Sequence, residues 1–188
     1  MKNILIGYWN DSSVTLAVFI VLSVMCNGCS SIVPPTTNSG KKYFETFYIG
    51  KEGTQNFIKP ILFKDERSNE ELILDMTFRY RNAIKDSAIV NFSIKSATLY
   101  KTIDSLKIAN EVIQAKSSEL ELLFNEKNKK GFTSRYSTKA SLQEIKEIYS
   151  NNTWEITIYF KNQITRYKPQ RKTMRAIDAV RDNVFIVM

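Results

Sequence analysis

The stretch Leu72-Ile-Leu-Asp-Met-Thr-Phe-Arg-Tyr-Arg81 alternates apolar and polar side chains along most of its length. Every second residue from Leu72 to Tyr80 is apolar or aromatic, whereas Asp75 and the odd-numbered residues after it are polar. Successive side chains of a β-strand point to opposite faces, so one face of this stretch can pack on a core while the other faces solvent. A helix would scatter the same apolar residues around its circumference. The stretch therefore predicts a half-buried strand.

The same period-two pattern recurs on both sides of this stretch. Residues 88–100 and 154–160 are the clearest further strands. The short linker over residues 83–87 favours a hairpin between the strand that contains Leu72 and residues 88–100. Weaker strands are expected over residues 43–49, 57–64, 106–113, 119–124 and 132–138. Pro60 lacks a backbone N–H, so we expect its strand to lie at a sheet edge.

Two short helices are expected between and after these strands. Ser141 and Glu144 have the spacing of a capping box, with Leu142 and Ile145 beginning an apolar face. Thr173 is predicted to cap a second helix near the C-terminus. Short antiparallel strands with one or two short helices predict a mainly β fold, an antiparallel β-sandwich that is immunoglobulin-like only in a loose architectural sense.

The first thirty residues have the organisation of an export signal. Lys2 precedes an apolar run over residues 14–25, and small residues then lead to Cys29. This segment resembles the signal of a bacterial lipoprotein, in which a small residue, here Gly28, precedes the cleavage site and the cysteine becomes the lipidated first residue of the mature chain. The resemblance implies a signal peptide over residues 1–28, a lipid bilayer held through acylated (palmitate-type) Cys29, and a place in the cell envelope, at the outer membrane.

Ordinary secretion and an uncleaved membrane helix are the other interpretations of this segment. A spanning helix needs about 20 apolar residues, and the polar residues 10–13 limit the apolar run to a shorter length. Residues 29–42 are rich in Ser, Thr, Pro and Gly and are expected to form a flexible tether. Residues 43–188 then have the length of a single β-rich domain.

The chain contains no histidine. This excludes Ser-His-Asp and Cys-His catalysis and histidine-ligated zinc. The acidic residues Asp65, Glu66, Glu70 and Glu71 fall in a polar loop between strands, whereas a glycosidase needs two carboxyls on a rigid scaffold. A carboxylate-based envelope hydrolase is therefore the least favoured function, and we expect no enzymatic activity, no cofactor and no metal site.

Positive charge is concentrated in the last third of the chain. Residues 127–188 contain 13 Lys and Arg against 5 Asp and Glu, whereas residues 43–126 contain 11 against 13. Such an asymmetry favours either an anionic partner or a solvated basic face. Nucleic acid is not expected outside the cytoplasm, which leaves an envelope protein or an anionic lipid or glycan. The residues expected to form this surface are Lys129, Lys130, Arg166, Lys168, Arg171 and Lys172.

Together these patterns predict a non-catalytic envelope lipoprotein that acts as an accessory protein, scaffold or binding module. The alternative is a surface adhesin or carbohydrate-binding domain, in which aromatic side chains stack on sugars. Trp154 lies on the same strand face as the apolar residues that follow it at every second position, and it is expected in the core. Tyr43 and Tyr48 lie in a strand with aromatic residues on both faces, so one set is expected to be exposed.

Overall fold

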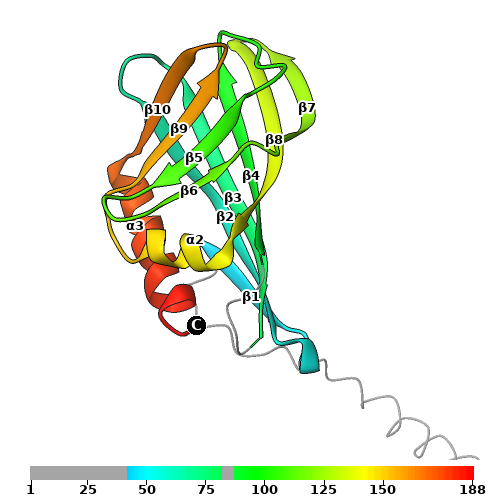
Figure 1. The fold of residues 1–188 in the computed structure, drawn as a ribbon, viewed down its shortest axis with the longest axis vertical. Helices are drawn as coiled ribbons and strands as arrows, with labels where there is room; N and C mark the ends of the chain where they lie inside the picture. Colours follow the sequence, from blue (N-terminus) through cyan, green and yellow to red (C-terminus); the bar gives the residue numbers. More distant parts are fainter. Residues whose placement is uncertain (1–41, 82–86) are drawn as a thin grey trace, which may run out of the picture. The chain divides into compact units, whose positions relative to one another are not determined.

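The computed structural model describes residues 42–81 and 87–188, and within them ten antiparallel strands form one sheet with two short α-helices (Figure 1). This confirms the mainly β, antiparallel architecture. The predicted signal peptide, Cys29 and all of the tether except Lys42 lie outside the described residues. The strands are β1 (Phe44–Tyr48), β2 (Thr54–Asp65), β3 (Glu71–Tyr80), β4 (Ser87–Ser96), β5 (Ser105–Ala109), β6 (Gln114–Ser117), β7 (Glu121–Asn128), β8 (Gly131–Ser141), β9 (Glu155–Phe160) and β10 (Gln163–Pro169).

The strands follow the order β6-β5-β9-β10-β2-β3-β4-β8-β7, and β1 pairs with β2. The sheet curls so strongly that β6, at one end of this order, reaches β8 near the other end (Figure 1). Ser117 Oγ lies 2.6 Å from Thr138 Oγ1, and the Thr138 hydroxyl donates to the Glu119 carbonyl at 2.7 Å. The two halves of the sheet therefore face each other around one core, as the sheets of a sandwich do.

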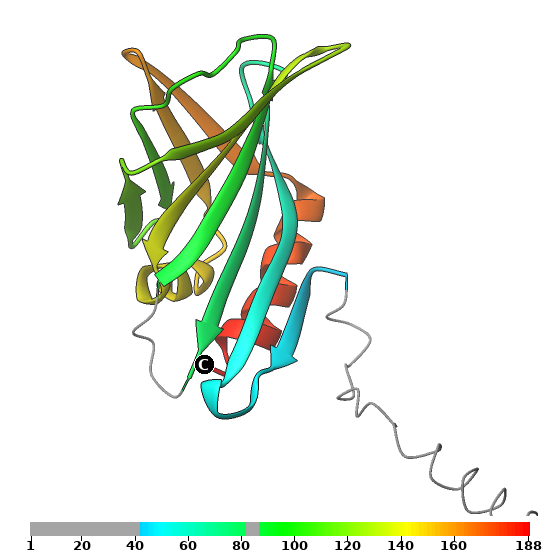
Figure 2. The same ribbon diagram turned by 90° about the vertical axis from the view of Figure 1, so that its right-hand side faces the viewer.

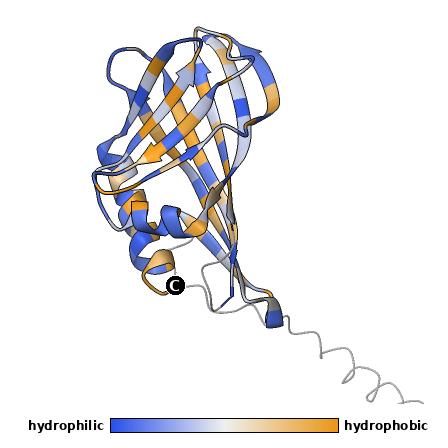
Figure 3. Ribbon diagram, viewed as in Figure 1, coloured by the Kyte–Doolittle hydropathy of each residue, from blue (hydrophilic) through white to orange (hydrophobic). Residues whose placement is uncertain are grey.

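The core follows the alternation that the sequence predicted. Leu72, Leu74, Met76 and Phe78 of β3 are all buried, and apolar and polar residues alternate along the strands in Figure 3. Trp154 is also buried, as expected. Its indole stacks on Phe63 with ring centroids 6.0 Å apart and meets Tyr149 edge-on at 4.5 Å.

Helix α2 (Leu142–Tyr149) begins as predicted. Ser141 is its N-cap, and the Ser141 side chain accepts a hydrogen bond from the Glu144 amide. Helix α3 (Arg171–Val180) begins earlier than predicted: Gln170 is its N-cap, and Thr173 lies inside the first turns with its hydroxyl donating to the Leu62 carbonyl of β2. The Thr173 side chain therefore fastens the helix to the sheet instead of capping it. A π-helical turn, η2 (Arg181–Phe185), continues α3.

Pro60 does not mark an edge strand, contrary to the prediction. β2 lies inside the sheet, between β3 on one side and both β1 and β10 on the other. β1 pairs with β2 only up to Ile58, and β10 pairs with it only from Phe63 onward. The register with β3 also shifts between Ile58 and Ile61. Pro60 therefore sits in a bulge between two partner strands, where its missing N–H leaves no ladder bond unmade.

Two predicted strands end earlier than expected because side chains form local turns. β4 ends at Ser96, whose hydroxyl accepts from the Thr98 amide at 2.9 Å. β5 ends at Ala109, because the Asn110 Oδ1 atom accepts from the amides of Val112 and Ile113, both at 2.8 Å. Residues 110–113 thus form a turn, and the short strand β6 follows it.

Candidate functional site: a groove at one end of the sheet

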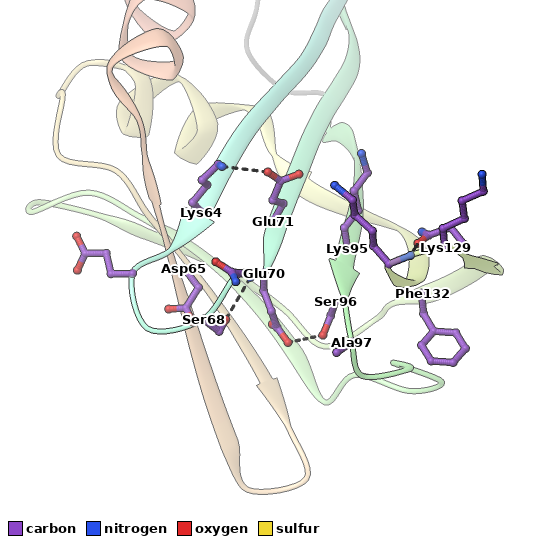
Figure 4. Close-up of a pocket in the computed structure, with 14 residues that line it drawn as sticks. Lys64, Asp65, Ser68, Glu70, Glu71, Lys95, Ser96, Ala97, Lys129 and Phe132 are labelled. Carbon is purple, nitrogen blue, oxygen red and sulfur yellow. Dashed lines mark hydrogen bonds and ion pairs between the residues drawn. The ribbon is translucent and has the colours of Figure 1, made fainter.

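An open groove of about 1320 Å³ lies at the end of β2, β3 and β4 (Figure 4). One wall is the β2–β3 loop with the adjoining ends of these strands, and the other is the turn between β7 and β8. Ser96 and Ala97, where β4 ends, lie between the two walls. Three strand ends and two turns therefore bring side chains from distant parts of the chain into one concave surface.

A row of charged side chains crosses the groove from strand to strand. Lys64 on β2 lies opposite Glu71 on β3, and Glu71 lies opposite Lys95 on β4. Lys64 Nζ and Glu71 Oε1 are 3.1 Å apart, so these two charges form an ion pair. Within the part of the chain that the structure describes, no carboxylate lies within 4 Å of the Lys95 amine. Lys95 therefore contributes an unneutralised positive charge to the groove.

The β7–β8 turn adds two further lysines beside Lys95. Asn128 fixes this turn, because its Oδ1 atom accepts from the Lys130 amide at 3.0 Å. Gly131 follows with a φ of +139°, and a Cβ there would overlap the Ser96 carbonyl oxygen, so the close approach of the turn to β4 requires glycine. Lys129 and Lys130 line the groove, and among residues 42–81 and 87–188 neither is within 4 Å of a carboxylate.

The opposite wall holds Glu70 in a network of hydroxyl donors. The Ser96 hydroxyl donates to Glu70 Oε1, and the hydroxyls of Tyr167 and Tyr100 donate to Oε2 at 2.9 and 3.1 Å. Burial, and then the negative charge of Glu70, raise the pKa of both tyrosine phenols, so each keeps its proton and remains a donor. The network joins the β2–β3 loop to β10 and to the chain that follows β4.

The other acidic residues of the predicted cluster are also engaged. Glu66 forms an ion pair with Lys168 at 3.1 Å, and the Asp65 carboxylate accepts from the Ser68 hydroxyl at 2.7 Å. With Glu70 in the hydroxyl network and Glu71 paired to Lys64, each of the four carboxylates has a partner. The groove is therefore polarised: one wall carries carboxylates with partners, and the other carries lysines without them.

The six basic residues predicted to form one surface fall into separate groups. Lys129 and Lys130 line the groove, whereas Arg166 and Lys168 lie on β10 and Arg171 and Lys172 begin α3. β10 and β7 are separated by four strands, which corresponds to about 24 Å measured along the sheet. Arg166 also approaches Glu155 at 3.7 Å, and Lys168 pairs with Glu66. The structure brings only the two turn lysines together with Lys95, which the sequence did not single out.

Aromatic residues that could stack on a sugar lie partly in the core and partly at the surface. Tyr167 is fully buried, so its ring cannot stack on a ligand. Phe47 and Tyr48 are exposed, whereas Tyr43 and Phe44 pack partly against the core. The prediction that one face of this strand is exposed is therefore wrong: each face carries one half-buried and one exposed aromatic residue, and the exposed ones lie toward the end of β1.

The chain matches no protein-family model, no curated protein and no solved structure. Among the described residues there is no group of three or more His, Cys, Asp or Glu side chains that could hold a metal ion. A search of the same residues finds no helix long and apolar enough to cross a membrane.

Proposed function

We propose that this chain is a lipid-anchored, non-catalytic binding module of the bacterial cell envelope, held at the outer membrane by acylated Cys29, and that the lysine wall of the groove binds an anionic group of an envelope component. The polar tether expected over residues 29–42 supports this arrangement, because it would separate the bilayer from a domain that begins with β1. In this arrangement the open groove would be accessible to another envelope component.

The observation that carries the proposed binding role is the difference between the two walls. Lys95, Lys129 and Lys130 share one groove without a carboxylate in ion-pair range in the described chain, whereas the carboxylates of the other wall are all engaged. The end of β4 and a turn fixed by Asn128 and Gly131 hold the backbone that carries these lysines, and their ammonium groups can bind phosphate or carboxylate oxygens.

The test is a calorimetric titration, at low and at moderate salt, of inorganic tripolyphosphate into the purified full chain in detergent. We expect binding that weakens with added salt and falls at least about tenfold in the triple variant Lys95→Gln/Lys129→Gln/Lys130→Gln. Arg171→Gln/Lys172→Gln, which changes the basic residues at the start of α3, is the comparison. Equal binding by the triple variant and the native chain would refute the groove, and a loss confined to the α3 variant would move the site there.

A further inference from the structure

The opposite end of the sheet carries a second surface of different chemistry. β1 and β2 are joined there by a short 3-10 turn, η1 (Gly50–Glu52), and Figure 2 shows this turn and the C-terminus at one end of β2 and the β2–β3 loop at the other. β2 contains 12 residues, which corresponds to about 40 Å between its ends. We call residues 47–57 the hairpin tip.

Large apolar side chains are exposed on both faces of the hairpin tip. Phe47 and Phe57 contact each other edge to face on one side, with ring centroids 5.7 Å apart, and are 48% and 39% exposed. Tyr48 falls on the other side, because side chains alternate along a strand, and it is 73% exposed. The core of the sheet can cover only one face of a hairpin, so exposed aromatic residues on both faces indicate a surface that contacts another component.

The C-terminal residues enlarge this apolar surface. Tyr48, Thr54 and Tyr80 lie in one row across β1, β2 and β3, and the Tyr80 hydroxyl donates to the Met188 carbonyl at 2.9 Å. Ile186 and Val187, just before Met188, are 72% and 71% exposed. The chain end thus adds two aliphatic side chains next to the row that contains Tyr48.

Basic residues outnumber acidic ones in the turn and along the strands that carry these apolar side chains. In residues 42–59 and 79–81 there are five basic residues against two acidic ones, Glu45 and Glu52, and Lys59 pairs with Glu45 at 2.7 Å. The basic residues are Lys42, Lys51, Lys59, Arg79 and Arg81. Aromatic rings that enter the headgroup layer, with cations beside them, are the combination that binds an anionic bilayer surface.

We propose that the hairpin tip and the adjoining C-terminal residues dock onto an anionic lipid surface. This inference rests on the proposed anchor at Cys29 only because the hairpin tip must be able to reach the bilayer. Residues 30–42 can span at most about 45 Å. The chain enters β1 beside the middle of β2, where the Lys59 amide donates to the Tyr43 carbonyl at 2.8 Å. A tether of this length permits the tip to touch the bilayer. Docking by this end would direct the lysine groove away from that membrane.

The test attaches an environment-sensitive fluorophore to the cysteine of Tyr48→Cys in the full chain. The labelled chain is mixed with vesicles of phosphatidylglycerol and phosphatidylcholine that contain nitroxide-labelled lipids, and quenching of the fluorescence by the nitroxides is measured. Ile164→Cys is the matched control, because Ile164 is 54% exposed on β10 near the opposite end. A chain without an introduced cysteine, labelled in parallel, reports any background from Cys26 and Cys29. We expect lipid quenching of the Tyr48 label only, and at least about a tenfold loss of docking for Lys42→Glu/Lys51→Glu relative to Lys101→Glu.

The outcomes separate this inference from the proposed anchor. Quenching at Tyr48 without fatty acid on Cys29 supports the docking surface and overturns the anchor. A lipidated chain whose Tyr48 label is as accessible to water as the Ile164 label overturns the docking surface alone. Protection of the Tyr48 label from water without lipid quenching would indicate contact with another protein copy, and it also overturns a lipid surface.

Discussion

Tyr167 on β10 donates its hydroxyl to the Glu70 carboxylate at 2.9 Å, across 97 residues of chain. This bond, together with those from Tyr100 and Ser96, fixes the wall of the groove that faces the lysines. A buried phenol on β10 therefore helps to hold the wall that lies opposite the lysines.

We expect Tyr167→Phe to lower the free energy of unfolding by about 1–3 kcal/mol, because a hydrogen bond to a charged acceptor is lost while the ring still fills its place. Lys168→Gln removes the ion pair with Glu66. Because both side chains of this pair are exposed, we expect the free energy of unfolding to fall by less than about 1 kcal/mol. Urea unfolding measures both values. A smaller loss for Tyr167→Phe than for Lys168→Gln would contradict the role given to the network.

Two buried tyrosines allow the contribution of a hydroxyl group to the free energy of unfolding to be compared with and without a hydrogen-bond partner. The Tyr136 hydroxyl donates to the Tyr100 carbonyl at 3.0 Å, whereas the buried Tyr149 hydroxyl has no hydrogen-bond partner in the described part of the chain. Tyr136→Phe should therefore destabilise the protein by about 1 kcal/mol, and Tyr149→Phe should be neutral or stabilising. Thermal unfolding of the two variants checks the order, and the reverse order would show that the Tyr149 hydroxyl is satisfied.

The stability should fall as the pH rises above 10. Burial raises the pKa of Tyr136 to about 12, whereas an unfolded tyrosine loses its proton near pH 10. The folded state thus binds more protons than the unfolded state between these values, so this contribution is complete below pH 10 and is lost as the pH approaches 12. We expect Tyr136→Phe to reduce the slope of unfolding free energy against pH in that window. An unchanged slope would count against the buried phenol as its source.

Gly131→Ala tests how closely the β7–β8 turn must approach β4. The added methyl would meet the Ser96 carbonyl oxygen, and the φ of +139° is strained for alanine. Gly50→Ala is the control, because Gly50 also has a positive φ but open space around it. We expect Gly50→Ala to cost about 1 kcal/mol and Gly131→Ala clearly more, measured by urea unfolding. Equal costs would show that the turn can move away from β4 without loss.

The sequence predicted the elements in which burial follows a simple period. β3 shows this best, since its buried residues from Leu72 to Phe78 alternate without exception. β10 was not predicted because Tyr167 is its only fully buried residue, so the strand has no period-two apolar pattern. β6 was missed for the same reason, with Ala115 as its one buried side chain.

The candidate site could be predicted only in part. Lys129 and Lys130 attracted attention as a local charge cluster, but Lys95 lies on a strand whose exposed lysine looks ordinary in the sequence. Its place beside them follows from the pairing of β4 with β8, which puts Ser96 opposite Phe132 next to the turn. Such pairing across more than thirty residues has no signal in the local pattern of a single chain.

The proposed lipid anchor is tested most directly by metabolic labelling with a palmitate analogue in cells that express the native chain, Cys29→Ala or Cys26→Ala. We expect the native chain and Cys26→Ala to incorporate the label and to fractionate with membranes, and Cys29→Ala to incorporate none. Undiminished labelling of Cys29→Ala would contradict attachment through Cys29.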